Sequence, residues 1–486
     1  MRNAGWLLVQ RVASAASGAL FAVTVPRLMG PDLYGRYALV VSLILWFTLL
    51  GSMGFTQAAA RFVPELSAPG REHDLRRFLA GFMGLRALTG GAGAIGLAVF
   101  GLLCLRELGG VAILAAAVAI ALRGVANLMY AFFLGLNWAA RWGMGQVVRG
   151  WVALVFVAAG AWLGGLRGAC IGLAATEIAV VCLAARWGRA HLVAPRLDWA
   201  AVRPYLPFGL AFVGVELTNA AFRYSGGLGL RWLAGDYAEV GRFSLAVEIN
   251  DVAGMVFPQV ALSLAPLLAG LWVDGRRSDA ALWLVRLSAS LGALGMAVAI
   301  AAAVAGEAAI PAVLGGQFAM VTPALVAITV SLPFVGLNCT AQVAAVTGRC
   351  PAWSLACAVA QLATFWTLAP ALVWRWGSTG CAMAYGASQI AAAAISAVIL
   401  RRVADASFVR WGLTVVLGLP LLALSGRVHA VWPSLAAAGA AAAGYLVLLA
   451  VTRIAPFSDL VGVWRGKRTS GDTGASERRG LPGRGQ

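Results

Sequence analysis

The sequence predicts an all-α polytopic membrane protein with about 14 transmembrane helices. The first observation is composition: of 486 residues, 61% are hydrophobic and only 12% are charged, whereas a soluble domain carries about twice that charged fraction. The second is pattern, because the apolar residues come in runs of about 20, the length at which a helix crosses the bilayer core. The third is a mean hydropathy of +0.84 over the chain.

The apolar runs give the expected helices in order. Six runs precede a basic connector at 186–207: they are 5–25, 37–55, 78–103, 111–136, 146–163 and 169–185. Six more follow it, at 208–230, 243–264, 282–304, 322–346, 352–374 and 380–400. Two further runs lie at 411–424 and 434–451, and the Gly-, Ser- and Arg-rich tail after them is expected to be disordered.

The connection between the first two runs, at 27–39, has a counterpart later in the chain. It contains the turn signal Gly30-Pro31-Asp32, and Gly35 permits a further change of direction. At 231–245 the sequence again places Gly235-Asp236 and then Gly241 between two apolar runs. This repetition predicts that one element occurs twice in a duplicated membrane protein.

The formal net charge of +18 indicates orientation. If the N-terminus is cytoplasmic, the cytoplasmic connections carry about twice as many arginines as the outer ones, so both termini are predicted to be cytoplasmic. The cytoplasmic set is Arg61, Arg71, Arg76, Arg77, Arg141, Arg149, Arg186, Arg189, Arg196, Arg203, Arg276, Arg277, Arg349, Arg401, Arg402 and Arg410. No soluble stretch is long enough to form a basic nucleic-acid-binding domain, so nucleic acid is not expected as a partner.

Several kinds of site are not expected from this sequence. The seven cysteines are scattered without a CxxC pair and the three histidines are isolated, which argues against disulfides and a metal site. A phosphate-binding Gly-x-x-x-x-Gly-Lys-Ser/Thr motif is missing, so neither nucleotide nor any other cofactor is predicted. The outer loops are too short to carry catalytic residues, and the first run is interpreted as a retained helix. We therefore expect a transporter and not an enzyme.

Two segments carry a resemblance to a known family. One combines Arg27-Leu28-Met29-Gly30 and Tyr34-Gly35 with Gly54-Phe55 and Arg61-Phe62-Val63-Pro64-Glu65. The other runs from Ile310-Pro311-Ala312-Val313-Leu314-Gly315-Gly316-Gln317-Phe318 through Pro323 and Ser331-Leu332-Pro333-Phe334 to Thr347-Gly348-Arg349. Together they resemble the oligosaccharide flippase (polysaccharide biosynthesis export) family, which shares a superfamily with the multidrug and toxin extrusion exporters and the lipid II flippases.

The resemblance implies an architecture and a substrate. It implies two pseudo-symmetric six-helix lobes, 1–190 and 191–403, around a central cavity, with two additional helices in 404–455 and a cytoplasmic tail at 456–486. The lobes would rock to give alternating access. The substrate would be an undecaprenyl-pyrophosphate-linked oligosaccharide, flipped across the cytoplasmic (inner) membrane for lipopolysaccharide or exopolysaccharide biosynthesis. Membrane lipids, a polysaccharide polymerase and a chain-length regulator are the candidate partners.

Three other functions stay open at the level of the sequence. A cation-coupled drug or metabolite antiporter of the same fold should place acidic residues in the cavity with few arginines. A lipid II flippase would use the same fold for a different lipid-linked sugar. A polysaccharide polymerase or ligase would show catalytic activity on lipid-linked sugar in detergent.

Five arginines are candidates for the pyrophosphate site, because a guanidinium matches phosphate oxygens bidentately. A charge inside the bilayer is costly unless it faces water or a partner. The candidates are Arg11, Arg61, Arg86, Arg123 and Arg223. The alternatives are that Arg11 reaches the membrane surface, that Arg61 anchors the cytoplasmic end of a helix, and that the others form interhelical ion pairs.

Acidic and amide side chains near Arg223 form a second set. Glu216, Asn219 and Arg223 have i, i+3, i+7 spacing and so share one helix face. Such a polar stripe must face the protein interior or water, either to line a cavity or to form a structural ion pair. Glu216, Glu248 and Asp251 are candidates for proton or sodium coupling, with Asn219 beside them. Glu177 is the remaining carboxylate within an apolar run.

Overall fold

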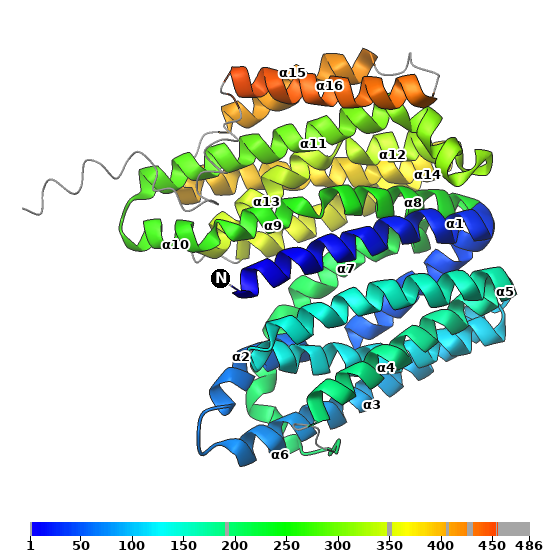
Figure 1. The fold of residues 1–486 in the computed structure, drawn as a ribbon, viewed down its shortest axis with the longest axis vertical. Coiled ribbons are helices and arrows are strands. Elements are labelled where there is room, and N and C mark those ends of the chain that lie inside the picture. The colour runs from blue at the N-terminus through cyan, green and yellow to red at the C-terminus, as the bar shows by residue number, and fades with distance from the viewer. Residues whose placement is uncertain are drawn as a thin grey trace, which may run out of the picture. The chain divides into compact units, whose positions relative to one another are not determined.

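The structure is a computed structural model that describes residues 2–189, 194–347, 352–404, 408–424, 431–452 and 454. Within these ranges every regular element is a helix and none is a strand (Figure 1). Among the described residues, eight segments are long and apolar enough to cross a membrane, and shorter apolar helices lie at Val409–Ala423 and Leu435–Val451. The predicted all-α, polytopic membrane fold is confirmed, whereas the count of 14 helices stays a prediction.

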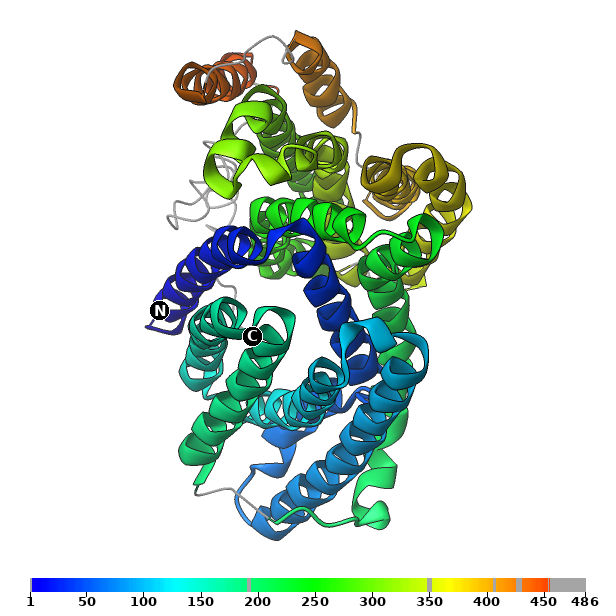
Figure 2. The ribbon, with the colours of Figure 1, turned by 90° about the vertical axis from the view of Figure 1, so that its right-hand side faces the viewer.

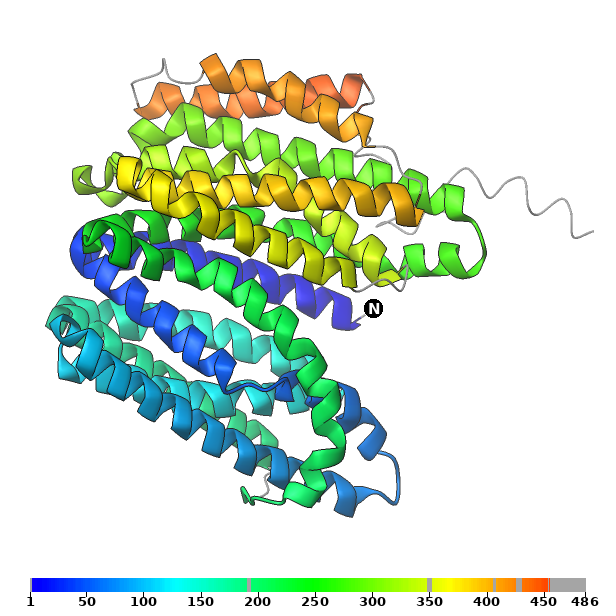
Figure 3. The ribbon, with the colours of Figure 1, turned by 180° about the vertical axis from the view of Figure 1, so that it is seen from behind.

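The chain forms two compact units, and the first contains the candidate site. It comprises Met1–Ala253, Gly306–Ile328 and Ser354–Ala392. Its helices up to the end of the first segment are α1 (Arg2–Leu50), α2 (Phe55–Leu66), α3 (Glu72–Cys104), η1 (Arg106–Leu108), α4 (Gly110–Gly135), α5 (Ala139–Gly188), α6 (Trp199–Val202), η3 (Arg203–Tyr205), α7 (Leu206–Ala234) and α8 (Tyr237–Gly254). Helix α4 packs on α3 and α5, while α1 packs on α5 and α7 (Figures 2 and 3).

The second unit comprises Gly254–Ala305, Thr329–Trp353 and Ala393–Gln486. Some of the remaining described helices have residues in both units. These helices are α9 (Val256–Ser263), α10 (Ala265–Val273), α11 (Arg277–Leu314), η4 (Gly316–Phe318), α12 (Val321–Thr329), α13 (Leu332–Thr347), α14 (Ala352–Ala404), α15 (Val409–Leu424) and α16 (Val431–Val451). Helix α13 packs on α9 and α10, and α15 packs on α16. The lobe boundaries at 190, 403 and 455 stay a prediction.

Glycines reverse or bend three of the long helices. In α5 the predicted turn at 164–168 contains Gly164 and Gly165, and Gly165 has φ 55° and ψ −133°. A Cβ at Gly160 would overlap the carbonyl oxygen of Gly168, so the two halves of α5 lie against each other. Gly377 gives α14 a nearly identical reversal, with φ 54° and ψ −129°, and Gly30 bends α1. L-residues rarely adopt these positive φ values, which explains the glycines.

Several predicted helix ends differ from the structure, and two of them affect the placement of arginines. The fifth helix was expected to begin at 146, but α5 begins at Ala139 and so carries Arg149 about three turns inward. The placement of Arg149 in a cytoplasmic connection is therefore wrong. The connection between the predicted runs 37–55 and 78–103 is not all loop, because α2 spans Phe55–Leu66 and carries Arg61. Hydropathy missed both ends because polar side chains at a helix end resemble a loop.

Candidate functional site

The two turns that look alike in sequence contact each other. A Cβ on Gly35 of α1 would overlap the carbonyl oxygen of Tyr237, and a Cβ on Gly241 of α8 would overlap that of Pro31. Each glycine lies four residues after the residue that the other one meets. The contact is thus reciprocal, as expected where two copies of one element meet across a pseudo-twofold axis.

A second close approach joins the start of α2 to the start of α7. Gly54 has φ 71°, and a Cβ there would overlap the carbonyl oxygen of Gly209. A Cβ on Gly209 would in turn lie 2.9 Å from the carbonyl oxygen of Gly54. Leu45 to Ser52 and Glu216 to Tyr224, which line a cavity, fall along the chain between this approach and the contact of Gly35 with Gly241, and Thr56 and Gln57 follow just after Gly54.

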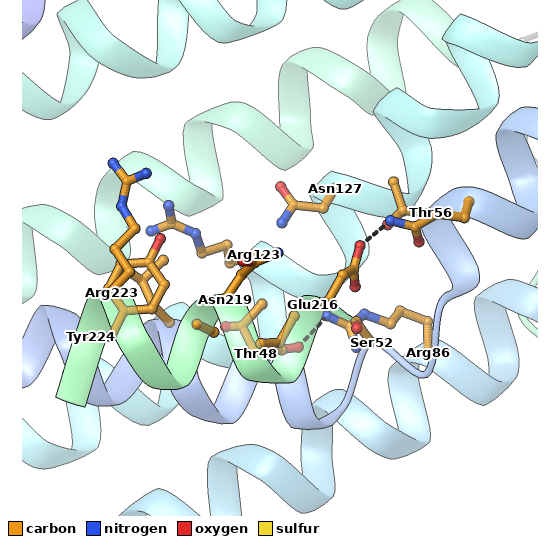
Figure 4. A pocket seen from close by; sticks show the side chains of 14 residues that line it. Thr48, Ser52, Thr56, Arg86, Arg123, Asn127, Glu216, Asn219, Arg223 and Tyr224 are labelled. Carbon is orange, nitrogen blue, oxygen red and sulfur yellow. Dashed lines mark hydrogen bonds between the residues drawn. The ribbon is translucent and has the colours of Figure 1, made fainter. Parts of the chain in front are cut away.

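The cavity has a volume of about 410 Å³ and receives side chains from five helices (Figure 4). Its lining residues are Leu45, Thr48, Leu49, Ser52, Thr56, Gln57, Arg86, Arg123, Asn127, Glu216, Asn219, Ala220, Arg223 and Tyr224. Three arginines and one carboxylate make the lining basic. Its size lies within the range of small-molecule sites in proteins.

Arg86 is the most deeply buried charge of the lining. It is 3% exposed and its Nη2 donates to the carbonyl oxygen of Thr48 at 3.0 Å. Its Nη1 makes no hydrogen bond, and Arg86 has no ion pair with any carboxylate of the described ranges. The guanidinium lies on Gly124 of α4, where a Cβ would stand 2.7 Å from its Nε. A buried cation without a counterion is costly, and an anion in the cavity would offset that cost.

Arg123 faces the cavity from α4 but is paired from behind. Its Nη1 lies 3.6 Å from Oε1 of Glu177, a carboxylate of α5 that is 1% exposed. Glu177 also lies 3.2 Å from Nη2 of Arg149, whose Nη1 donates to Oδ1 of Asn127 at 2.9 Å. Asn127 stands one turn after Arg123 on α4 and also lines the cavity.

The predicted polar face of α7 is present in the structure. Glu216, Asn219 and Arg223 all line the cavity, and in Figure 4 Arg223 lies at the left while Asn219 and Glu216 lie nearer the middle. Glu216 accepts a hydrogen bond from Nε2 of Gln57, and Nη2 of Arg223 lies 2.5 Å from Oδ2 of Asp251 in α8. Arg223 is thus both a lining residue and one half of an ion pair, which joins the two alternatives that the sequence left open.

Among the described side chains, three other predicted residues do not line the cavity, namely Arg61, Glu248 and Asp251. Arg61 is exposed on α2, where it pairs with Glu65 at 2.5 Å. Glu248 accepts a hydrogen bond of 2.5 Å from the hydroxyl of Tyr34, which is 3% exposed. The side chain of Arg11 lies outside the described residues. Substrate binding and ion coupling by all the predicted residues stay predictions.

Sequence analysis missed several lining residues, namely Thr48, Ser52, Thr56, Gln57, Asn127 and Tyr224. They are neutral, and single neutral polar side chains in apolar runs give no signal that separates lining from core. It also missed Arg149, because the start of its helix was placed too late.

Comparison with known proteins decides the family. A profile described as "Polysaccharide biosynthesis protein" matches residues 1–272, more than half of the chain. The chain belongs to the polysaccharide biosynthesis protein family. Among curated proteins, none matches it in sequence.

Solved structures of similar fold show the architecture that this chain shares with other proteins. The lipid II flippase MurJ in an inward closed conformation is 13% identical with a TM-score of 0.71, over 94% of this chain and 99% of that one. An inward-facing multidrug resistance MATE transporter of the MOP superfamily is 14% identical with a TM-score of 0.58, over 85% and 95%. The Vibrio cholerae MATE transporter VcmN in its bent form is 13% identical with a TM-score of 0.52, over 82% and 99%. This family member therefore has a multi-pass transporter fold.

Proposed function

We propose that this protein flips undecaprenyl-pyrophosphate-linked oligosaccharide repeat units across the cytoplasmic membrane for surface polysaccharide biosynthesis, by alternating access. It acts as a transporter and not as an enzyme, with both termini in the cytoplasm. The observation that carries the proposal is Arg86, a buried guanidinium on the cavity wall without a carboxylate partner among the described residues. Arg123 and Arg223 add two more guanidiniums to the same cavity.

The chemistry of the lining fits a pyrophosphate with sugars attached. Guanidiniums bind phosphate oxygens bidentately, and the side chains of Thr56, Gln57 and Asn127 offer hydrogen bonds to hydroxyl groups. An inside-negative membrane potential favours outward movement of the anion by about 2.3 kcal/mol per charge per 100 mV. Polymerisation of the delivered repeat units by a partner polymerase, with its chain-length regulator, would remove the product.

The test is deletion of the gene in its host, followed by analysis of lipid-linked sugars and surface polysaccharide. We expect complete lipid-linked repeat units to accumulate inside the cell while the surface glycan is lost, and the wild-type gene to restore both. Accumulation of lipid II would instead identify a lipid II flippase. Unchanged glycans with new sensitivity to cationic toxins would identify an antiporter and contradict the proposal.

A further inference from the structure

Glu177 lies behind the cavity wall and contacts two arginines at once. Its carboxylate is 1% exposed and does not line the cavity. One oxygen lies 3.6 Å from Arg123 of α4, and the other lies 3.2 Å from Arg149 in the first half of α5. The reversal at Gly164 and Gly165 brings Arg149 and Glu177, which belong to different halves of one helix, into contact with each other, and Glu177 also contacts Arg123 of α4.

The same network fixes the orientation of Asn127. Its Oδ1 accepts a hydrogen bond of 2.9 Å from Nη1 of Arg149. Because Arg149 only donates, it orients the amide oxygen of Asn127 toward itself, and the two hydrogens of the amide nitrogen remain for a ligand. The two polar residues that α4 turns toward this part of the cavity, Arg123 and Asn127, therefore both present hydrogen-bond donors. Two neighbouring hydrogen-bond donors suit an anion.

The three charged side chains of the network together set the net charge behind this part of the cavity wall. Arg123 and Arg149 carry two positive charges and Glu177 carries one negative charge, so the network is singly positive. Without Glu177 the two guanidiniums would repel each other in a region of low dielectric. Without Arg149, the negative charge of Glu177 would cancel the charge that Arg123 presents to the cavity.

We infer that Glu177 is a positioning residue for the anion site: with Arg149 it orients Arg123 and Asn127 and limits the positive charge that the bound anion meets. This inference rests on the proposed function, because it assigns a role within the same cavity. Limiting that charge matters for a transporter, since an anion must bind tightly enough to enter and loosely enough to leave. Neither Arg149 nor Glu177 touches the cavity, so both act through Arg123 and Asn127.

The test measures binding of inorganic pyrophosphate to the purified full-length protein in lipid nanodiscs at fixed ionic strength. Glu177→Gln raises the charge of the network by one, and we expect the dissociation constant to fall about tenfold. Arg149→Gln lowers the charge by one, and we expect the constant to rise about tenfold. The double variant restores the original charge, so its constant should lie within about twofold of the wild type.

The double variant separates charge setting from mere structural support. If the three groups only stabilised the fold, each single variant would bind more weakly and the double variant no better than either. Asp279→Asn serves as the matched control, because Asp279 forms an exposed ion pair with Arg276 in the second unit and should not alter binding. Monodisperse elution of each variant checks folding, and if Glu177→Gln is unfolded, the contrast between Arg149→Gln and the double variant still decides.

The outcomes distinguish this inference from the proposed function. Binding by the wild type with equal constants in all three variants would overturn the role of Glu177 and leave the proposed function standing. Loss of binding in all three variants would likewise overturn it. Absence of pyrophosphate binding by the wild type would overturn both the proposed function and the inference.

Discussion

Arginines serve opposite purposes in two regions of the first unit. Near the contact of α1 with α8, Arg231 lies 2.5 Å from Glu107, and Arg36 and Arg231 place their guanidinium carbons 4.7 and 4.5 Å from the ring centroid of Tyr237. Arg36 pairs with Asp32 and Arg231 pairs with Glu107, so both arginines have a carboxylate partner from the protein. In the cavity, Arg86 is more deeply buried than these arginines, yet it forms no ion pair with a carboxylate of the described ranges. The comparison teaches that burial alone does not distinguish a binding arginine from a structural one, whereas the missing partner does.

Glu107, near the contact of α1 with α8, is stabilised as a carboxylate by its neighbours. Hydrogen bonds from Tyr237 and then Arg231 lower the pKa of the Glu107 carboxyl below its ordinary value. The carboxylate is half exposed, so the gain in stability is small. The ion pair of Glu107 with Arg231 therefore joins two segments of the structure, and neither charge needs a ligand as its partner.

The largest effect is expected from Arg86→Ala. Loss of this guanidinium removes a phosphate donor from the cavity, so export of surface glycan should be abolished while the amount of protein in the membrane is unchanged. Arg86→Lys should restore export only in part, because the bidentate fork is lost. The measurement is surface polysaccharide in a deletion strain that carries each variant. Arg276→Ala, which removes an exposed arginine, is the control. Normal export by Arg86→Ala would show that a buried arginine without a carboxylate partner is not needed for transport.

A smaller but clear effect is expected from Gly35→Ala. The added methyl group would overlap the carbonyl oxygen of Tyr237, and forcing the helices apart should lower the free energy of unfolding by about 1–3 kcal/mol. Thermal unfolding of the purified protein measures this. Gly241→Ala disturbs the same contact from the other side, so the double variant should lose less than the sum of the two.

Gly91→Ala is the matched control for this prediction. Gly91 lies within α3 and an added Cβ would meet nothing within 4 Å. Alanine favours a helix over glycine by up to about 1 kcal/mol, so this variant should be as stable as the wild type or slightly more so. Equal stability of Gly35→Ala and Gly91→Ala would show that the two helices do not need their close contact.

The smallest effect is expected at Glu107. Glu107→Gln should cost about 0.2–1 kcal/mol at pH 7, the value of an exposed ion pair. Because the folded-state pKa is lowered, the stabilisation is present above the ordinary pKa of a glutamate and is lost as the pH falls through the lower, folded value. Thermal unfolding at pH 7 and at acid pH should therefore show a difference between wild type and variant that shrinks on acidification. A difference that persists at acid pH would mean that the ion pair is not its source.

The sequence predicted the fold and part of the cavity for identifiable physical reasons. Charges are rare in apolar runs, so Arg86 and Arg123 stood out, and the i, i+3, i+7 spacing placed Glu216, Asn219 and Arg223 on the face that lines the cavity. Neutral lining residues such as Asn127 gave no such signal. Which arginine lacks a partner depends on contacts between distant segments, and a pattern along one helix does not contain them.

The glycine reversals of α5 and α14 have a consequence for how the chain enters the membrane. Gly165 and Gly377 have almost the same φ and ψ angles, and φ is positive at both. At each of them the backbone reverses its direction within a few residues. The halves of each helix are therefore already in contact, and no long polar loop has to be carried across the lipid by itself. Each hairpin can be inserted as a unit during synthesis, with its two spans paired before the rest of the chain is complete.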